Sequence, residues 1–165
     1  MRAIFPASFD PITNGHLDIA TRASRLFDEL VVAVYDKPAK RLLFDLDERV
    51  ALARAATAHL PNVRVEPFSG LMVEFARRIG AGVVVRGMRA ASDFDAEHQL
   101  AIAYRELAPE LEVVVLMGHS TWSFVSSSLI KEIAVLGGDV ASFVPAPVAR
   151  RLRQSYPSLK SPDGQ

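Results

Sequence analysis

Short runs of apolar and β-branched residues recur along the chain and alternate with longer amphipathic stretches. The side chains in these runs are apolar almost without interruption, rather than at every second position, which is typical of strands covered on both faces. Alternation of such strands with helices indicates an α/β fold with a doubly wound parallel sheet. We therefore predict a five-stranded sheet, with strands at residues 2–5, 30–35, 63–65, 83–85 and 113–117.

The amphipathic stretch after the first predicted strand indicates a surface helix over residues 17–27. Its apolar positions Ile19, Ala23, Leu26 and Phe27 form one stripe, opposite a charged face. Cap and stop signals predict three more helices. Asp45 with Glu48 opens one to about residue 58, Ser92 with Asp95 opens one to residue 107, and the Gly137-Gly138 pair closes one that begins near Ser127.

The length of 165 residues is that of one domain with a substantial core. No repeat, low-complexity tract or break in composition divides residues 1–156, so we expect them to form a single domain. Residues 157–165 combine Pro, Ser, Lys, Asp and Gly with one leucine and offer little to bury, which predicts a disordered tail.

The charges balance, with 19 lysine and arginine residues against 19 aspartate and glutamate residues. No overall field therefore favours nucleic acid or an acidic membrane as partner, and any anion site must be local. The chain has no cysteine, which excludes disulfides, thiolate metal sites and thiol nucleophiles. No apolar run approaches the roughly 20 residues of a membrane helix, and the first is too short for a signal peptide. We expect a cytoplasmic protein.

The loop after the first strand contains the tetrapeptide Thr13-Asn14-Gly15-His16. In an open α/β sheet this loop lies at the carboxyl ends of the strands, where ligands bind. Gly15 lets the backbone approach a ligand, the first N–H groups of the helix attract phosphate, and His16 adds a donor that can be cationic. In isolation, Asn14 could equally be a plain helix cap with His16 on the surface. The loop matches neither G-x-G-x-x-G nor G-x-x-x-x-G-K-[ST].

Two further segments suited to anions follow later strands. Arg86-Gly87-Met88-Arg89 comes directly after the fourth strand, and two guanidiniums that flank a glycine can fork onto phosphate oxygens. Taken alone, the arginines could equally be solvated. Ser126-Ser127-Ser128 follows the fifth strand and opens a helix, whose hydroxyl caps and N–H groups suit an anion. No acid-base triad is indicated, so we reject serine-hydrolase chemistry.

The long form of the first loop, Ser8-Phe9-Asp10-Pro11 through Thr13-Asn14-Gly15-His16, closely resembles the N-terminal signature of the phosphopantetheine adenylyltransferases. These are nucleotidyltransferases marked by a [HT]-x-G-H sequence. The resemblance covers about residues 2–152 and implies a Rossmann-like nucleotidyltransferase fold. It continues at Asp47-Glu48-Arg49-Val50, at Arg86-Gly87-Met88-Arg89 and at Trp122-Ser123-Phe124-Val125-Ser126-Ser127-Ser128.

The resemblance implies transfer of the adenylyl group of ATP to 4′-phosphopantetheine, which gives dephospho-coenzyme A and pyrophosphate. Because the attacking group is already a phosphate anion, no strong general base is required, and catalysis is positioning plus stabilisation of charge on phosphorus. His16 and Lys40 are the candidate catalytic residues; Lys40 lies in a charged loop whose other cations, Lys37 and Arg41, we interpret as solvated.

The same resemblance implies a set of binding residues. Those for the acceptor substrate are Ser8, Lys40, Met72 and Arg86, although Met72 could equally be core. Those for ATP are Ser8, Phe9, His16, Gly87, Met88, Arg89, Glu97, Trp122, Ser123, Phe124, Val125, Ser126, Ser127 and Ser128. Three positions depart from the family pattern: Ala7 replaces a common glycine, Ser8 a frequent threonine, and Ala96 a frequent tyrosine, so an aromatic contact is lost there.

Mg²⁺ is the expected cofactor and should accompany the triphosphate of ATP. The sequence has no clustered carboxylates suited to a dedicated metal cage, so substrate oxygens and water should hold the ion. The resemblance also implies a homohexamer, and coenzyme A as a feedback inhibitor at the acceptor site.

Two other functions remain open. One is another adenylyl- or cytidylyltransferase of the same superfamily, acting on nicotinamide mononucleotide or a polyol phosphate; the segment 86–89 with Lys40 and Met72 favours pantetheine. The other is a non-catalytic nucleotide-binding module, against which the presence of His16, Lys40 and Arg89 together argues.

Overall fold

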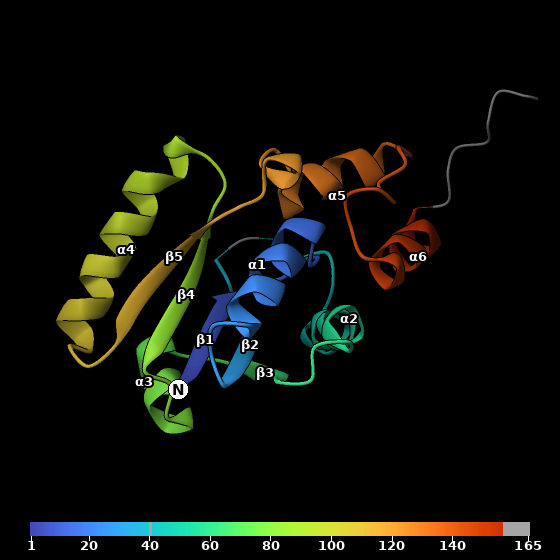
Figure 1. Cartoon of the computed structure of the whole chain (residues 1–165). Helices are drawn as coiled ribbons and strands as arrows, with labels where there is room; N and C mark the ends of the chain where they lie inside the picture. Colours follow the sequence, from blue (N-terminus) through green and yellow to red (C-terminus); the bar gives the residue numbers. More distant parts are fainter. Residues whose placement is uncertain (40, 157–165) are drawn as a thin grey trace, which may run out of the picture.

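The computed structural model describes residues 1–39 and 41–156 and contains one five-stranded sheet (Figure 1). Its strands are β1 (Arg2–Ala7), β2 (Glu29–Tyr35), β3 (Val63–Phe68), β4 (Val83–Met88) and β5 (Glu112–Met117). All pairs are parallel, and the order across the sheet is β3-β2-β1-β4-β5. The predicted doubly wound α/β fold is confirmed. Lys40 and the predicted tail at 157–165 lie outside the described residues.

Two apolar cores cover the two faces of the sheet. One layer of helices comprises α1 (Asn14–Ser24), α2 (Leu46–Thr57), α5 (Ser127–Val135) and α6 (Ala146–Ser155), and the other comprises α3 (Met72–Ile79) and α4 (Phe94–Leu107) (Figure 1). Within β1, Ala3 and Phe5 belong to the core under the first layer, whereas Ile4 belongs to the other. This division explains why consecutive strand residues are apolar.

The boundaries of α1 differ from the predicted ones. The helix begins at Asn14 and ends at Ser24, rather than spanning 17–27. Leu26 therefore lies beyond the helix in a turn and is 61% exposed, so its predicted place on the apolar stripe is wrong. Ile19 and Ala23, which lie within the helix, are buried as the stripe predicts.

The predicted helix caps have different outcomes. Asp45 caps α2, as predicted. The predicted capping box of Ser92 and Asp95 at the start of α4 is wrong, because a short 3-10 turn precedes this helix and Asp93 occupies the cap position. The carboxylate of Asp93 is instead bonded to the backbone N–H of Arg89. The side chain of Asp93 therefore makes no cap bond to α4, because it binds Arg89 at the end of the preceding strand.

The sequence pattern predicts neither α3 nor α6. These helices have only eight and ten residues. α3 nevertheless buries Met72, Val73, Phe75 and Ala76 on one face. In the part of the chain that the structure describes, no helix combines the length and the apolar character needed to cross a bilayer.

Arg49 on α2 is fully buried and donates hydrogen bonds to four backbone carbonyl oxygens. Burial lowers the pKa of its guanidinium, and the nearby carboxylates of Asp10, Asp36 and Asp45 oppose that shift. Buried carbonyl groups need donors, so this one side chain joins the loop after β1, the end of β2 and the start of α2. The accepting oxygens belong to Ser8 (2.8 Å), Tyr35 (2.6 Å), Asp36 (2.9 Å) and Phe44 (3.2 Å).

Replacement of Arg49 by methionine should destabilise the fold strongly, because methionine leaves these carbonyl oxygens without donors. A hydrogen bond to a charged group contributes about 1.5–3 kcal/mol, so the free energy of unfolding should fall by at least ~3 kcal/mol in urea titrations. Arg54→Met on the same helix is the control. Arg54 donates a bond of 3.3 Å to the carbonyl of Val65, and its loss should change stability by less than ~1 kcal/mol. Equal losses in the two variants would contradict an anchoring role for Arg49.

Candidate active site

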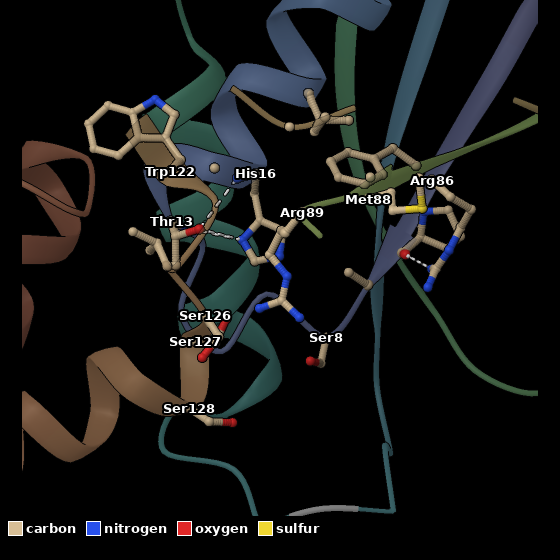
Figure 2. Close-up of a pocket in the computed structure, with 18 residues that line it drawn as sticks. Ser8, Thr13, His16, Arg86, Met88, Arg89, Trp122, Ser126, Ser127 and Ser128 are labelled. Atoms are coloured by element: carbon tan, nitrogen blue, oxygen red, sulfur yellow. Dashed lines mark hydrogen bonds between the residues drawn. The ribbon is translucent and has the colours of Figure 1, made fainter. Parts of the chain in front are cut away.

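A cavity of about 370 Å³, here called the main cleft, opens between the carboxyl ends of β1 and β4 (Figure 2). The strand order reverses at these two strands, and such a switch point is where doubly wound folds bind ligands. Its volume lies within the roughly 300–1,000 Å³ of small-molecule sites. The predicted site residues that line it are Ser8, His16, Arg86, Gly87, Met88, Arg89, Trp122, Val125, Ser126, Ser127 and Ser128.

His16 is held in a fixed orientation by the start of α1. Its Nδ1 accepts the backbone N–H of Thr13 at 3.1 Å, and the Thr13 hydroxyl accepts the N–H of His16 at 3.3 Å, so the two residues form a reciprocal cap (Figure 2). A backbone N–H can only donate, which makes Nδ1 the acceptor and leaves the proton of the neutral ring on Nε2. The local structure thus makes Nε2 of His16 a hydrogen-bond donor.

Asn14 is not the cap of α1; Thr13 is. The N–H of Asn14 donates to the carbonyl of Phe143 at 2.9 Å, and its side chain donates to Ser142 at 3.1 Å. Part of the N-terminal N–H set of α1 is therefore engaged within the protein. The capacity of this helix start to bind phosphate through its backbone is smaller than the sequence suggests.

Phe9 lies beneath the ring of His16 rather than on the wall of the main cleft. Its side chain is buried, and the two ring centroids are 5.1 Å apart in an edge-on arrangement. Its φ of 46° is in the left-handed region, which is strained for a bulky residue. The aromatic packing fixes the imidazole from behind, and the predicted ATP contact of Phe9 would have to come from its backbone.

Arg86 belongs to β4, which extends to Met88, rather than to a loop after the strand. Its guanidinium makes a two-pronged ion pair with Glu97 of α4, with N–O distances of 2.6 and 2.8 Å, and it also donates to the carbonyl of Pro6 at 3.0 Å. Burial alone would lower the pKa of Arg86, but the bonds and charge of Glu97 outweigh it and raise the pKa. Arg86, predicted to bind the acceptor substrate, and Glu97, predicted to bind ATP, are thus paired with each other.

Gly87 faces α1, on the side of β4 opposite to Arg86. A Cβ atom at this position would lie 3.0 Å from Cγ1 of Ile19. The glycine therefore allows α1 to pack closely on β4. The sequence instead suggests a close approach of the backbone to a ligand as the reason for the glycine. This packing sets the distance between the helix that carries His16 and the strand that carries Arg86.

Arg89, directly after β4, borders the main cleft and pairs with Asp93. Asp93 accepts two guanidinium bonds of 3.2 Å and the backbone N–H of Arg89 at 3.0 Å. Burial would raise the pKa of Asp93, but these bonds from Arg89 outweigh it and lower the pKa.. Asp93 is therefore an anion that orients a cation at the cleft.

The three serines at the start of α5 have different partners. The hydroxyl of Ser126 caps the helix by accepting the N–H of Leu129 at 3.1 Å, and the hydroxyl of Ser127 donates to the carbonyl of Pro11 at 2.9 Å. The first N–H groups of a helix have no partner within it, and Ser127 and Ser128 place theirs at the border of the main cleft. This helix start is well suited to an anion.

The segment before α5 contributes to the main cleft only in part. Trp122 and Val125 line it, whereas Ser123 and Phe124 do not. The Ser123 hydroxyl donates to the carbonyl of Ser120, and the ring of Phe124 packs edge-on against Phe143. The predicted ATP contacts of Ser123 and Phe124 stay predictions.

A second cavity of about 360 Å³, here called the apolar cavity, adjoins the main cleft. The two share Pro6, Ala7, Ser8 and Arg86 on their walls. The predicted acceptor residues Ser8, Met72 and Arg86 all line the apolar cavity, and Met72 is also part of the core. Lys40, the fourth, lies outside the described residues. Sequence reasoning missed the aromatic walls of this cavity, which are Tyr35, Phe68 and Tyr104. Tyr35 and Phe68 end β2 and β3, so their positions at the carboxyl edge of the sheet were a usable signal, whereas Tyr104 comes from α4.

Comparisons with known proteins agree with this geometry. Residues 4–133 match the sequence model of the cytidylyltransferase-like family. A phosphopantetheine adenylyltransferase of Herpetosiphon aurantiacus is 58% identical over 154 residues, which cover 93% of both chains. One from Roseiflexus sp. (strain RS-1) is 54% identical over 154 residues, 93% of this chain and 96% of its own. The chain belongs to the phosphopantetheine adenylyltransferases. The resemblance stated from the first loop is confirmed.

The fold of this phosphopantetheine adenylyltransferase family member also occurs in a more distant solved structure. A candidate nicotinate-nucleotide adenylyltransferase from Vibrio parahaemolyticus superimposes with a TM-score of 0.68 at 20% identity, over 92% of this chain and 97% of that chain. At that identity the likeness concerns the fold alone. It agrees with the predicted nucleotidyltransferase architecture.

The described part of the site has few side chains that could hold a metal ion without help from a substrate. Within residues 1–39 and 41–156, no three His, Cys, Asp or Glu side chains are grouped to hold an ion. No acidic side chain is among the residues that line the main cleft. The described residues therefore do not fit a resident Mg²⁺ site.

Gly87→Ala should disturb the packing that joins α1 to β4. The added methyl group meets Ile19, and overpacking of this kind costs about 1–3 kcal/mol, so the thermal midpoint and turnover should both fall. Gly82→Ala, just before the same strand, is the matched control, because a Cβ atom there meets nothing within 4 Å. If the two variants have the same stability and the same turnover, the packing role of Gly87 is wrong.

Proposed function

We propose that the chain transfers the adenylyl group of ATP to 4′-phosphopantetheine, with His16 and Lys40 stabilising the charge that develops on the transferred phosphorus. An oxygen of the acceptor phosphate attacks the α-phosphorus of ATP, the bond from that phosphorus to the β-phosphate bridge breaks, and pyrophosphate leaves. The observation that carries the proposal is the pair of adjoining cavities that share Ser8 and Arg86: the main cleft, which arginine and serine side chains help to line, and the mainly apolar second cavity.

The apolar cavity suits the pantetheine arm of the acceptor. Its wall of Tyr35, Phe68, Leu71 and Met72 offers apolar contact along a flexible chain, and Ser8 and Arg86 lie on the wall that it shares with the main cleft. A phosphate there would meet the hydroxyl of Ser8 and the guanidinium of Arg86, for which it would compete with Glu97. This placement would bring the attacking oxygen to the boundary with the main cleft.

The main cleft suits the triphosphate of ATP. The start of α5 supplies N–H groups from Ser127 and Ser128, and Arg89, which also lines the cleft, supplies a cation. His16 lines the same cleft, and its Nε2 is the donor proposed to act on the transferred phosphorus. Catalysis then rests on placement of the reactants and on donors fixed before the reaction, and His16 forms no covalent bond.

Mg²⁺ is proposed to arrive with ATP as part of the substrate. The ion prefers oxygen ligands and keeps much of its water, so the triphosphate and water can complete its coordination. The absence of acidic side chains among the residues lining the main cleft supports this route over a resident site.

His16→Ala should lower kcat by about 10²–10³-fold while changing the KM for ATP little, because the Nε2 bond is proposed to form mainly in the transition state. His16→Gln, which keeps an N–H donor, should retain more activity than the alanine variant. His59→Ala, an exposed histidine on another part of the chain, is the control. Near-normal kcat in His16→Ala would rule out this role.

The acceptor is tested by measuring pyrophosphate release from ATP and Mg²⁺ with a panel of acceptors. Turnover should be greatest with 4′-phosphopantetheine and far lower with pantetheine, nicotinamide mononucleotide or a polyol phosphate. Faster turnover with any of the last three would overturn the proposed acceptor. ATP binding without turnover on every acceptor would favour a non-catalytic nucleotide-binding protein.

We also propose a homohexamer, inhibition by coenzyme A and a cytoplasmic location, where ATP is available. α4 has no buried residue yet exposes the apolar side chains Phe94, Ile102 and Leu107, which supports burial against other copies of the chain. Coenzyme A contains the pantetheine arm and would occupy the apolar cavity. Sedimentation equilibrium should give the mass of six copies, and a stable monomer would contradict the hexamer. Inhibition by coenzyme A should be competitive with 4′-phosphopantetheine, and purely non-competitive inhibition would contradict binding at the acceptor site.

A further inference from the structure

Asp10, in the loop after β1, is a fully buried carboxylate that the proposed chemistry does not use. Its Oδ2 accepts the N–H of Leu43 and its Oδ1 accepts the N–H of Phe44, both at 2.9 Å. Burial of a carboxylate is unfavourable unless it is paired and hydrogen-bonded. These bonds fix the segment between β2 and α2 to the loop that leads to His16.

Lys131 on α5 supplies the charge that pairs with Asp10. Its Nζ lies 2.9 Å from Oδ2 of Asp10 and 3.4 Å from the carbonyl oxygen of Arg41. One turn earlier on the same helix, the Ser127 hydroxyl donates to the carbonyl of Pro11, next to Asp10. A single ammonium thus contacts the loop after β1, the segment after β2 and the helix proposed to bind the ATP phosphates.

The segment between β2 and α2 has two separate anchors. Arg49 binds the carbonyl oxygens of Asp36 and Phe44 at its two ends. The Asp10–Lys131 pair instead binds the stretch from Arg41 to Phe44, which directly follows Lys40 in the chain. The first anchor serves the fold, since it ties strands and helix together. The second holds a short stretch against α5, which suggests a role in the site.

We infer that Lys131 is a positioning residue for the transfer reaction: through Asp10 and Arg41 it holds residues 41–44 against the start of α5 and thereby positions the chain next to Lys40. Lys131 is not among the residues that line the main cleft. It acts on the substrates through its neighbours. The inference rests on the proposed catalytic role of Lys40, and Asp10 is the group that transmits the position.

The test compares Lys131→Met with Lys131→Arg by steady-state kinetics on the full chain. Misplacement of a catalytic group by about 1 Å can cost about 100-fold, so Lys131→Met should lower kcat by about 10- to 100-fold with the KM for ATP within about threefold of wild type. Lys131→Arg keeps a cationic donor and should recover most of kcat. Lys37→Met, an exposed lysine in the same segment, is the matched control and should leave kcat unchanged.

Double variants then separate positioning from a general structural effect. In a Lys40→Ala background, Lys131→Met should lower kcat by less than about threefold more, because the group that it positions is gone. In a His16→Ala background, the same change should retain its full effect. Amide exchange should accelerate at Leu43 and Phe44 while the strands of the core stay protected.

Three outcomes would overturn the inference: unchanged kcat in Lys131→Met, a raised KM for ATP with normal kcat, or an equal effect in the Lys40→Ala background. If Lys131→Met does not fold, Lys131→Gln takes its place in the same cycle, because it also removes the charge while keeping a donor. A Lys40→Ala variant with normal kcat would overturn both the role of Lys40 and the route assigned to Lys131. Turnover of the wild-type chain with 4′-phosphopantetheine tests the proposed reaction separately.

Discussion

The irregular loops at the carboxyl edge of the sheet contain buried N–H and C=O groups that no strand ladder pairs, and the site depends on how these groups are satisfied. Two buried charged side chains bind several of these groups. Arg49 donates to four carbonyl oxygens, and Asp10 accepts from two N–H groups, so these bonds connect the loops after β1 and β2 to each other and to α2. The walls of the main cleft are therefore held by interactions that lie behind them.

The same constraint acts on His16. The N–H of Thr13 needs an acceptor, and the nearest one is Nδ1 of the imidazole. This bond satisfies the backbone and at the same time assigns the ring proton to Nε2. The same hydrogen bond thus caps the helix and orients the imidazole, and the ring of Phe9 packs edge-on against it.

The features that could be predicted from the sequence are those that a local pattern of residues determines. Uninterrupted apolar runs located the five strands, and the ordered motifs identified the family, which the comparisons confirm together with the enzyme class. Pairings between distant side chains were not visible in the same way. Asp10 and Arg49 lie within the family motifs and Lys131 lies outside them, but the sequence showed neither the burial of Asp10 and Arg49 nor the partners of any of the three, because tertiary contacts decide both. Gly87 was assigned to a ligand, whereas its neighbour across the layer is Ile19. The roles of the individual site residues stay predictions.

The two-pronged contact between Arg86 and Glu97 has a consequence for molecular recognition. The guanidinium on the shared wall already has a carboxylate partner, so an incoming ligand must compete for it. A phosphate monoester carries enough charge and the right oxygen geometry to do so, whereas an uncharged hydroxyl end does not. If the acceptor phosphate binds Arg86 as proposed, this ion pair would favour a phosphate over a neutral group, and discrimination would arise from a competitor within the protein as well as from the shape of the cavity.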